Sequence, residues 1–74
     1  MNVGERVIKV LKKHKKTEIN ESTLLKKDLQ IDSLDFMDMV FDIEDEFGIE
    51  VDIDAVKDLE TVGDVIEYVK TLAK

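Results

Sequence analysis

One serine and the acidic residues around it are the part of this 74-residue chain that could do chemistry. Ser33 could act as a nucleophile only with a neighbouring base, and nothing in the sequence places the single imidazole, His14, near it. The carboxylates are expected on an exposed face, where they stay ionised and make poor acid–base pairs. The chain has no Cys, and residues 45–54 lack the oxygen spacing of a calcium loop. We therefore expect neither a catalytic residue nor a metal site.

Ser33 stands where a helix is expected to begin, and it has two physical interpretations. Its hydroxyl could cap the helix by accepting a backbone N–H. Alternatively, Ser33 could be a modification site, because the free N–H groups and the dipole at a helix N-terminus stabilise an anionic group. Asp32 would then cap the helix in its place. The residues alone leave both interpretations open.

The helix that would position Ser33 is expected to end at Gly48, which suits a left-handed cap. Leu34 and Phe41 point away from its core-facing side, among aspartates. Outward apolar residues surrounded by carboxylates indicate a docking surface. The core-facing stripe itself follows helical spacing and consists of Phe36, Met39, Val40, Ile43 and Phe47.

The elements before this helix are a first helix and a long connection. The first helix is expected from a cap at Asn2 to about His14, and residues 17–31 follow as a loop. Leu24, Leu25, Leu29 and Ile31 are expected to hold the loop against the helices. The first helix would bury Val3, Val7, Ile8, Val10 and Leu11, and near its end lie Lys9, Lys12, Lys13, Lys15 and Lys16.

The elements after Gly48 are an extended loop and two more helices. Residues 48–54 alternate as a strand would, but no partner strand is available, so we expect a loop and then a short helix over about 53–58. Thr61 begins the last helix, with Asp64 completing a capping box. Its buried face would hold Val62, Val65, Ile66, Val69 and Leu72. The prediction is a single all-α domain over residues 1–74, a small bundle of three longer helices and one short.

Charge is divided sharply along the chain. Residues 1–27 hold eight Lys or Arg against three Asp or Glu, whereas residues 28–74 hold three against fifteen. The acidic part disfavours nucleic acid and favours transient partners with basic patches. No apolar run is long enough to span a bilayer and no signal peptide is present, so we expect a cytoplasmic monomer without stable membrane insertion.

Three segments together carry a resemblance to a known family. They are Asp32-Ser33-Leu34, the acidic stretch Glu44-Asp45-Glu46-Phe47-Gly48-Ile49-Glu50-Val51, and Thr61-Val62-Gly63-Asp64. In this order and at these separations, the chain resembles a stand-alone acyl carrier protein of the type II fatty-acid or polyketide kind. The resemblance covers roughly residues 5 to 72.

The resemblance implies a function for several residues. Ser33, flanked by Asp32, would carry a 4′-phosphopantetheine arm, moved from coenzyme A by a phosphopantetheinyl transferase, and the thiol of the arm would hold an acyl thioester. The chain would be a carrier and not an enzyme. Acyl-loading and acyl-processing enzymes with basic patches would dock on Leu34, Asp35, Asp38, Phe41, Glu44 and Asp45. The acyl pocket would involve Phe36, Met37, Met39 and Val40, although Met39 also suits ordinary core packing.

The chain departs from the family pattern at Gln30, Asp52 and Val56, where the family commonly has Gly, Pro and a small residue. These departures leave the pathway open between fatty-acid, polyketide and specialised lipid synthesis. Three alternative functions also remain: an aminoacyl or peptidyl carrier, an unmodified regulatory module with the same fold, and a small hydrolase.

Overall fold

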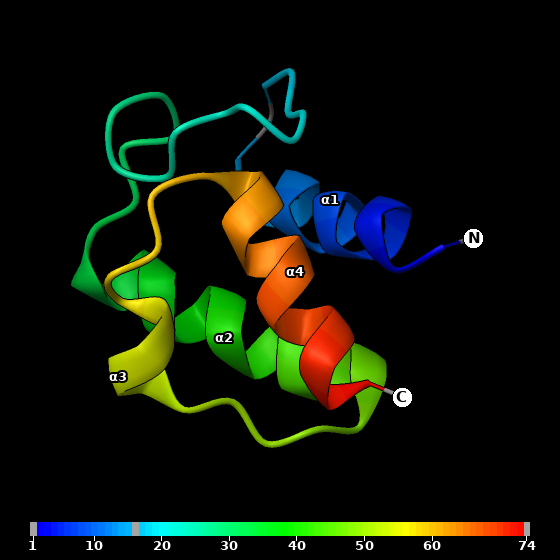
Figure 1. Ribbon diagram of the computed structural model, residues 1–74. Coiled ribbons are helices and arrows are strands. Elements are labelled where there is room, and N and C mark those ends of the chain that lie inside the picture. The colour runs from blue at the N-terminus through cyan, green and yellow to red at the C-terminus, as the bar shows by residue number, and fades with distance from the viewer. Residues whose placement is uncertain (1, 16, 74) are drawn as a thin grey trace.

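The computed structural model describes residues 2–15 and 17–73, with only the backbone of Ser33. Over these residues the chain forms four helices, α1 (Val3–His14), α2 (Ser33–Phe47), α3 (Ile53–Val56) and α4 (Val62–Leu72), and no strand (Figure 1). This confirms the predicted all-α fold with three longer helices and one short. Lys16, a member of the basic cluster, lies outside the described residues.

The capping residues that the sequence predicted are found at the ends of α1, α2 and α4. The Asn2 side chain accepts the Glu5 N–H at 2.8 Å and starts α1. Gly48 adopts φ 64° and ends α2 in a left-handed cap. Thr61 and Asp64 form the predicted capping box of α4. The short helix α3 ends at Val56, two residues before the predicted end.

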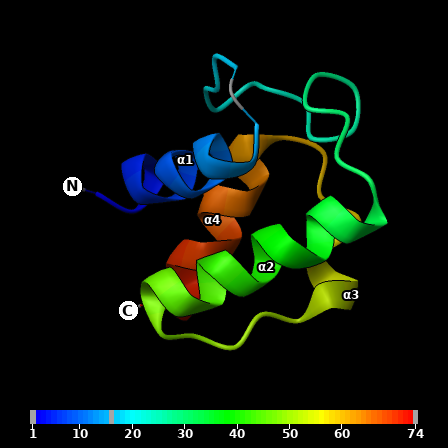
Figure 2. The same ribbon diagram turned by 180° about the vertical axis from the view of Figure 1, so that it is seen from behind.

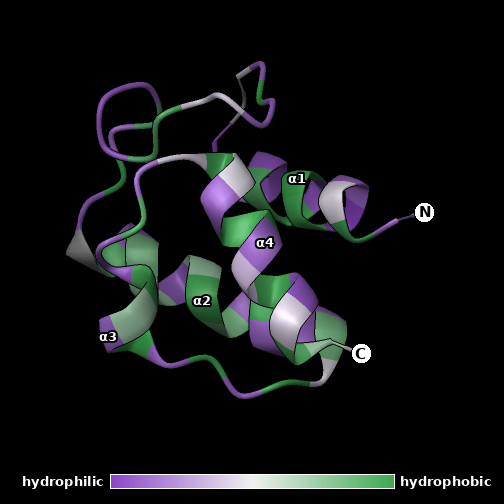
Figure 3. Cartoon of the chain, in the orientation of Figure 1, coloured by the Kyte–Doolittle hydropathy of each residue, from purple (hydrophilic) through white to green (hydrophobic). Residues whose placement is uncertain are grey.

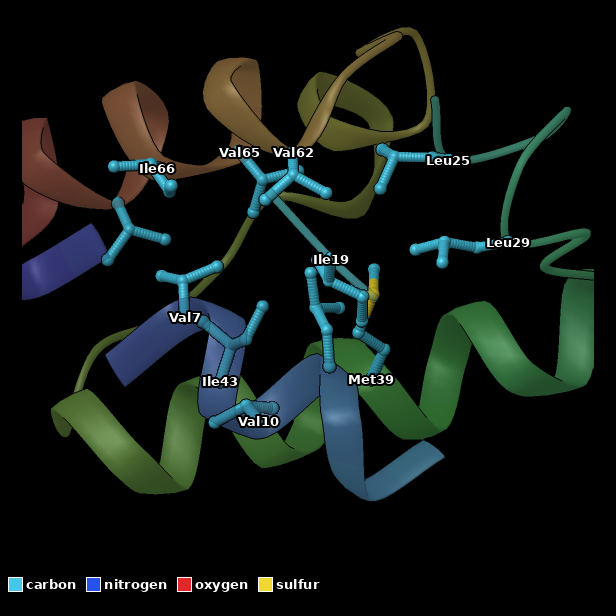
Figure 4. Close-up of a cluster of buried hydrophobic side chains, with 12 residues drawn as sticks. Val7, Val10, Ile19, Leu25, Leu29, Met39, Ile43, Val62, Val65 and Ile66 are labelled. Atoms are coloured by element: carbon cyan, nitrogen blue, oxygen red, sulfur yellow. The ribbon is translucent and has the colours of Figure 1, made fainter. Parts of the chain in front are cut away.

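The core gathers the apolar faces of α1, α2 and α4 (Figure 4). Leu72 was expected in it, but this prediction is wrong, because the residue is 39% exposed in the last turn of α4. Ile19, which the sequence pattern did not single out, is buried there. The fully confirmed core positions are Val7, Val10, Leu11, Leu25, Leu29, Met39, Val40, Ile43, Val62, Val65, Ile66 and Val69, while Val3, Ile8, Ile31, Phe36 and Phe47 pack at its edge.

The long connection between α1 and α2 crosses one end of the bundle, beside the start of α4 (Figures 1 and 2). Leu25 and Leu29 bury it, as predicted, and backbone bonds add to this. The Leu25 N–H donates to the Glu60 carbonyl at 2.9 Å, and the Val62 N–H donates to the Thr23 carbonyl at 2.9 Å. The loop is thereby attached to the segment that leads into α4.

Every helix carries both hydrophobic and hydrophilic residues, as amphipathic helices around one core should (Figure 3). Within the described part of the chain, no helix has the length and hydrophobicity that a membrane crossing requires.

Candidate functional site

The N-terminus of α2 is capped by Asp32. Its carboxylate accepts the Asp35 N–H at 2.9 Å, and its backbone carbonyl accepts the Phe36 N–H at 2.8 Å. Ser33 is therefore the first residue inside the helix, and the interpretation of Ser33 as the N-cap is wrong. The side chain of Ser33 lies outside the described part of the structure.

This arrangement suits an anionic group on Ser33. The capping function is already filled by Asp32, so a substituent on the Ser33 oxygen would cost α2 no capping bond. Because α2 is 15 residues long, its N-terminus offers a full helix dipole and backbone N–H groups to a phosphodiester.

A pocket of about 440 Å³ opens beside Asp32, between the start of α2, α3 and the long loop. Phe36 and Met37, two of the four residues predicted for an acyl pocket, line it. Met39 and Val40 do not line it, because both are buried in the core. The floor is apolar and the rim is charged; the lining residues are Leu25, Lys26, Ile31, Asp32, Phe36, Met37, Ile53, Lys57, Asp58 and Leu59.

Two hydrogen bonds fix the segment that forms the far wall of this pocket. The Asp52 N–H donates to the Tyr68 hydroxyl at 3.1 Å, which holds the entry to α3 against α4. The Asp52 carboxylate in turn accepts the Asp54 N–H at 3.0 Å and caps α3. Asp52 thus has a definite structural function at the position where the family commonly has Pro.

Leu34 and Phe41 lie on the outside of α2, as the helical spacing predicts. Leu34 is 78% exposed and Phe41 is 51% exposed. Asp38 and Asp45 are also exposed. These four residues are spaced i, i+4, i+7 and i+11, so they form one row along the helix, which we call the outer row.

The other acidic residues of α2 contact the rest of the chain. Asp35 pairs with Lys15, with 2.9 Å between Nζ and Oδ2. Asp42 and His14 are joined by a hydrogen bond of 2.6 Å between Oδ2 and Nε2. Glu46 pairs with Arg6 at 2.9 Å. The predicted docking residue Glu44 accepts the Val51 N–H at 2.8 Å and holds the loop after α2.

Sequence reasoning missed these pairings. Patterns of charge along each helix identify exposed residues, but they do not give the register of one helix against another. The contact of His14 with Asp42 spans 28 residues, and that of Arg6 with Glu46 spans 40. The only available signal was that most cations lie in the first 27 residues and most carboxylates beyond them.

Comparisons with known proteins agree with this geometry. The family profile described as the phosphopantetheine attachment site matches residues 3–69. A protein of Exiguobacterium sibiricum named acyl carrier protein is 39% identical over 71 residues, which cover 96% of this chain and 89% of that protein. The acyl carrier protein of Thermotoga maritima is 41% identical over 54 residues, covering 73% of this chain and 67% of the relative.

A solved structure shares the arrangement of the helices. It comes from a Mycobacterium tuberculosis protein assigned as an acyl carrier protein, and it superposes with a TM-score of 0.86 at 28% identity. The superposition covers 95% of this chain and 97% of that structure. The chain therefore belongs to the family of acyl carrier proteins, whose shared domain is the attachment site of phosphopantetheine.

Proposed function

We propose that Ser33 is the residue to which 4′-phosphopantetheine is attached, and that the chain carries acyl groups among separate enzymes. The observation that carries this proposal is the start of α2, where Asp32 provides the cap and Ser33 is the first helical residue. Ser22, the other serine of the chain, lies in an exposed turn and its hydroxyl donates to the Asn20 side chain. Ser22 thus has no helix N-terminus to stabilise a phosphodiester.

The residues around Ser33 would hold and orient the attached group. When bound, the group supplies a terminal thiol on which an acyl chain is held as a thioester. The N-terminus of α2 stabilises the phosphodiester, and Asp32 keeps the helix capped. The apolar floor of the pocket, including Phe36 and Met37, would shelter a short acyl chain from water. Met39 and Val40 form the deeper packing and would contact cargo only if α2 moved.

The partners in this proposal are a phosphopantetheinyl transferase and acyl-processing enzymes with basic docking patches. The outer row of Leu34, Asp38, Phe41 and Asp45 offers two apolar anchors that alternate with two carboxylates, which complements such a patch. We also assign Asp35 and Glu44 to this surface, with smaller contributions because each already contacts the chain. The protein would act as a cytoplasmic monomer and not as a catalyst, in fatty-acid, polyketide or specialised lipid synthesis.

An acyl transfer experiment tests this function. The purified chain is incubated with butyryl coenzyme A, Mg²⁺ and a broad-specificity phosphopantetheinyl transferase, and its intact mass is measured before and after hydroxylamine. We expect a gain equal to the arm plus the butyryl group, of which hydroxylamine removes only the butyryl group, because it cleaves thioesters and leaves the phosphodiester. A folded chain without any gain would contradict the proposal.

A further inference from the structure

Basic side chains of α1 and of the residue after it face the acidic side of α2 at three points. From the start of α1 onward they are Arg6 with Glu46, His14 with Asp42, and Lys15 with Asp35. Arg6 also stacks over the Phe47 ring, with its guanidinium carbon 4.4 Å from the ring centre. We call the three carboxylates in these contacts the paired acids. They are spaced i, i+7 and i+11 and form one side of α2.

The paired acids and the outer row share one helix but differ in electrostatic state. Asp38 and Asp45 of the outer row form no ion pair within the described residues, so their full charge faces solvent. Each paired acid has a basic side chain at 2.6 to 2.9 Å, and a cation of a docking partner must compete with that side chain. A basic protein approaching α2 therefore meets two carboxylates without an ion pair among the described residues, whereas the three paired acids and Glu44 are already engaged.

We propose that Lys15 is a specificity-determining residue that screens Asp35 from basic partners. Asp35 is two residues from Ser33, so it is the paired acid nearest the attachment position. The side chains of Lys15 and Asp35 are 28% and 37% exposed, so water screens the pair and a partner cation competes with Lys15 directly. An enzyme that reads Asp35 must displace Lys15, whereas one that reads the outer row binds without that competition. The inference rests on the proposed function, because it assumes that basic partners dock on α2.

The test compares two variants that change the net charge equally. Lys15→Met removes the screening cation and keeps an apolar stem of similar length. Lys12→Met is the control, because Lys12 is exposed on α1 and has no ion pair among the described residues. The dissociation constant of each variant for the transferase is measured by surface plasmon resonance at about 20 mM and about 500 mM NaCl.

At low salt we expect Lys15→Met to bind about 2- to 5-fold more tightly than Lys12→Met, the range of an exposed ion pair. The difference should disappear at high salt. Equal affinities of the two variants at low salt would overturn the proposal, and so would the absence of binding by any variant.

A second comparison separates screening from a change in fold. Asp35→Asn should weaken transferase binding less than 2-fold in the wild-type background and more strongly in Lys15→Met, because only there does the carboxylate have no competing Lys15 ammonium. Asp38→Asn should weaken binding equally in both backgrounds. Equal effects of Asp35→Asn in the two backgrounds would overturn the proposal. These measurements record binding and not attachment of the arm. A chain that binds the transferase but gains no arm would contradict the function proposed for Ser33. The proposal for Lys15 would still be decided by the ratio of the dissociation constants of Lys15→Met and Lys12→Met.

Discussion

Asp32 caps α2, so its replacement by Ala should destabilise the folded chain. Asp32→Ala removes the carboxylate that accepts the Asp35 N–H at 2.9 Å and leaves this N–H without its partner. Loss of an N-cap costs about 0.5–2 kcal/mol. The lost attraction between the carboxylate and the helix dipole adds about 0.3–1 kcal/mol. Because Asp32 is exposed, we take the lower parts of both ranges and expect a loss of about 1–1.5 kcal/mol.

For a domain of this size, each kcal/mol lowers the melting temperature by about 4–8 °C. Asp32→Ala should therefore melt about 5–10 °C below the wild type in thermal unfolding followed by far-UV circular dichroism. Asp32→Asn keeps an acceptor oxygen without the charge, so it should lose less than half of this. Ser33→Ala should change the melting temperature by less than about 2 °C, because Ser33 is not the cap.

Two results would refute this reasoning. A melting temperature of Asp32→Ala within about 1 °C of the wild type would mean that the Asp32 cap contributes nothing measurable. A loss in Ser33→Ala as large as that in Asp32→Ala would restore the capping hypothesis for Ser33, which the geometry contradicts.

Three further predictions concern other parts of the chain. Backbone hydrogen bonds from Thr61 and Glu60 hold the pKa of Asp64 below its ordinary value. The ionised Asp64 carboxylate therefore stabilises the fold at any pH above its pKa in the unfolded chain, and this stabilisation is lost as the pH falls through its lower pKa in the folded chain. Asp64→Asn should flatten the fall of the melting temperature below about pH 4, and an unchanged acid limb would contradict this. Gln30 adopts φ 51°, a left-handed conformation, so Gln30→Gly should raise the melting temperature slightly, whereas Gln30→Val should lower it by several degrees; the opposite order would exclude strain at this position. Finally, a net charge of −7 implies repulsion among the charges of the folded chain, so raising NaCl from about 20 to about 200 mM should raise the melting temperature. A lower melting temperature at the higher salt concentration would contradict this self-repulsion.

The sequence predicted the helices well because their signals are local. Asn2, Gly48 and the pair of Thr61 and Asp64 each terminate a helix through contacts within a few residues. The outward position of Leu34 and Phe41 followed from helical geometry alone. These features require no knowledge of how the helices pack.

The features that the sequence did not predict depend on packing between distant segments. Ile19 is buried only because the long loop folds onto the core, and Leu72, the last residue of α4, is exposed although its spacing places it on the apolar face. The pairing of Lys15 with Asp35 depends on the register of α1 against α2, which the spacing within one helix does not give. Likewise, the pocket is bounded by α2, α3 and the loop, so Met39 and Val40 could not be separated from Phe36 and Met37 by spacing.

The most direct test of the central claim is the mass of the chain after incubation with coenzyme A, Mg²⁺ and a phosphopantetheinyl transferase. We expect the wild type and Ser22→Ala to gain about 340 Da, the mass of the arm. Ser33→Ala should stay folded by circular dichroism and gain nothing. A gain of the arm by folded Ser33→Ala, or no gain by the folded wild type, would contradict the account.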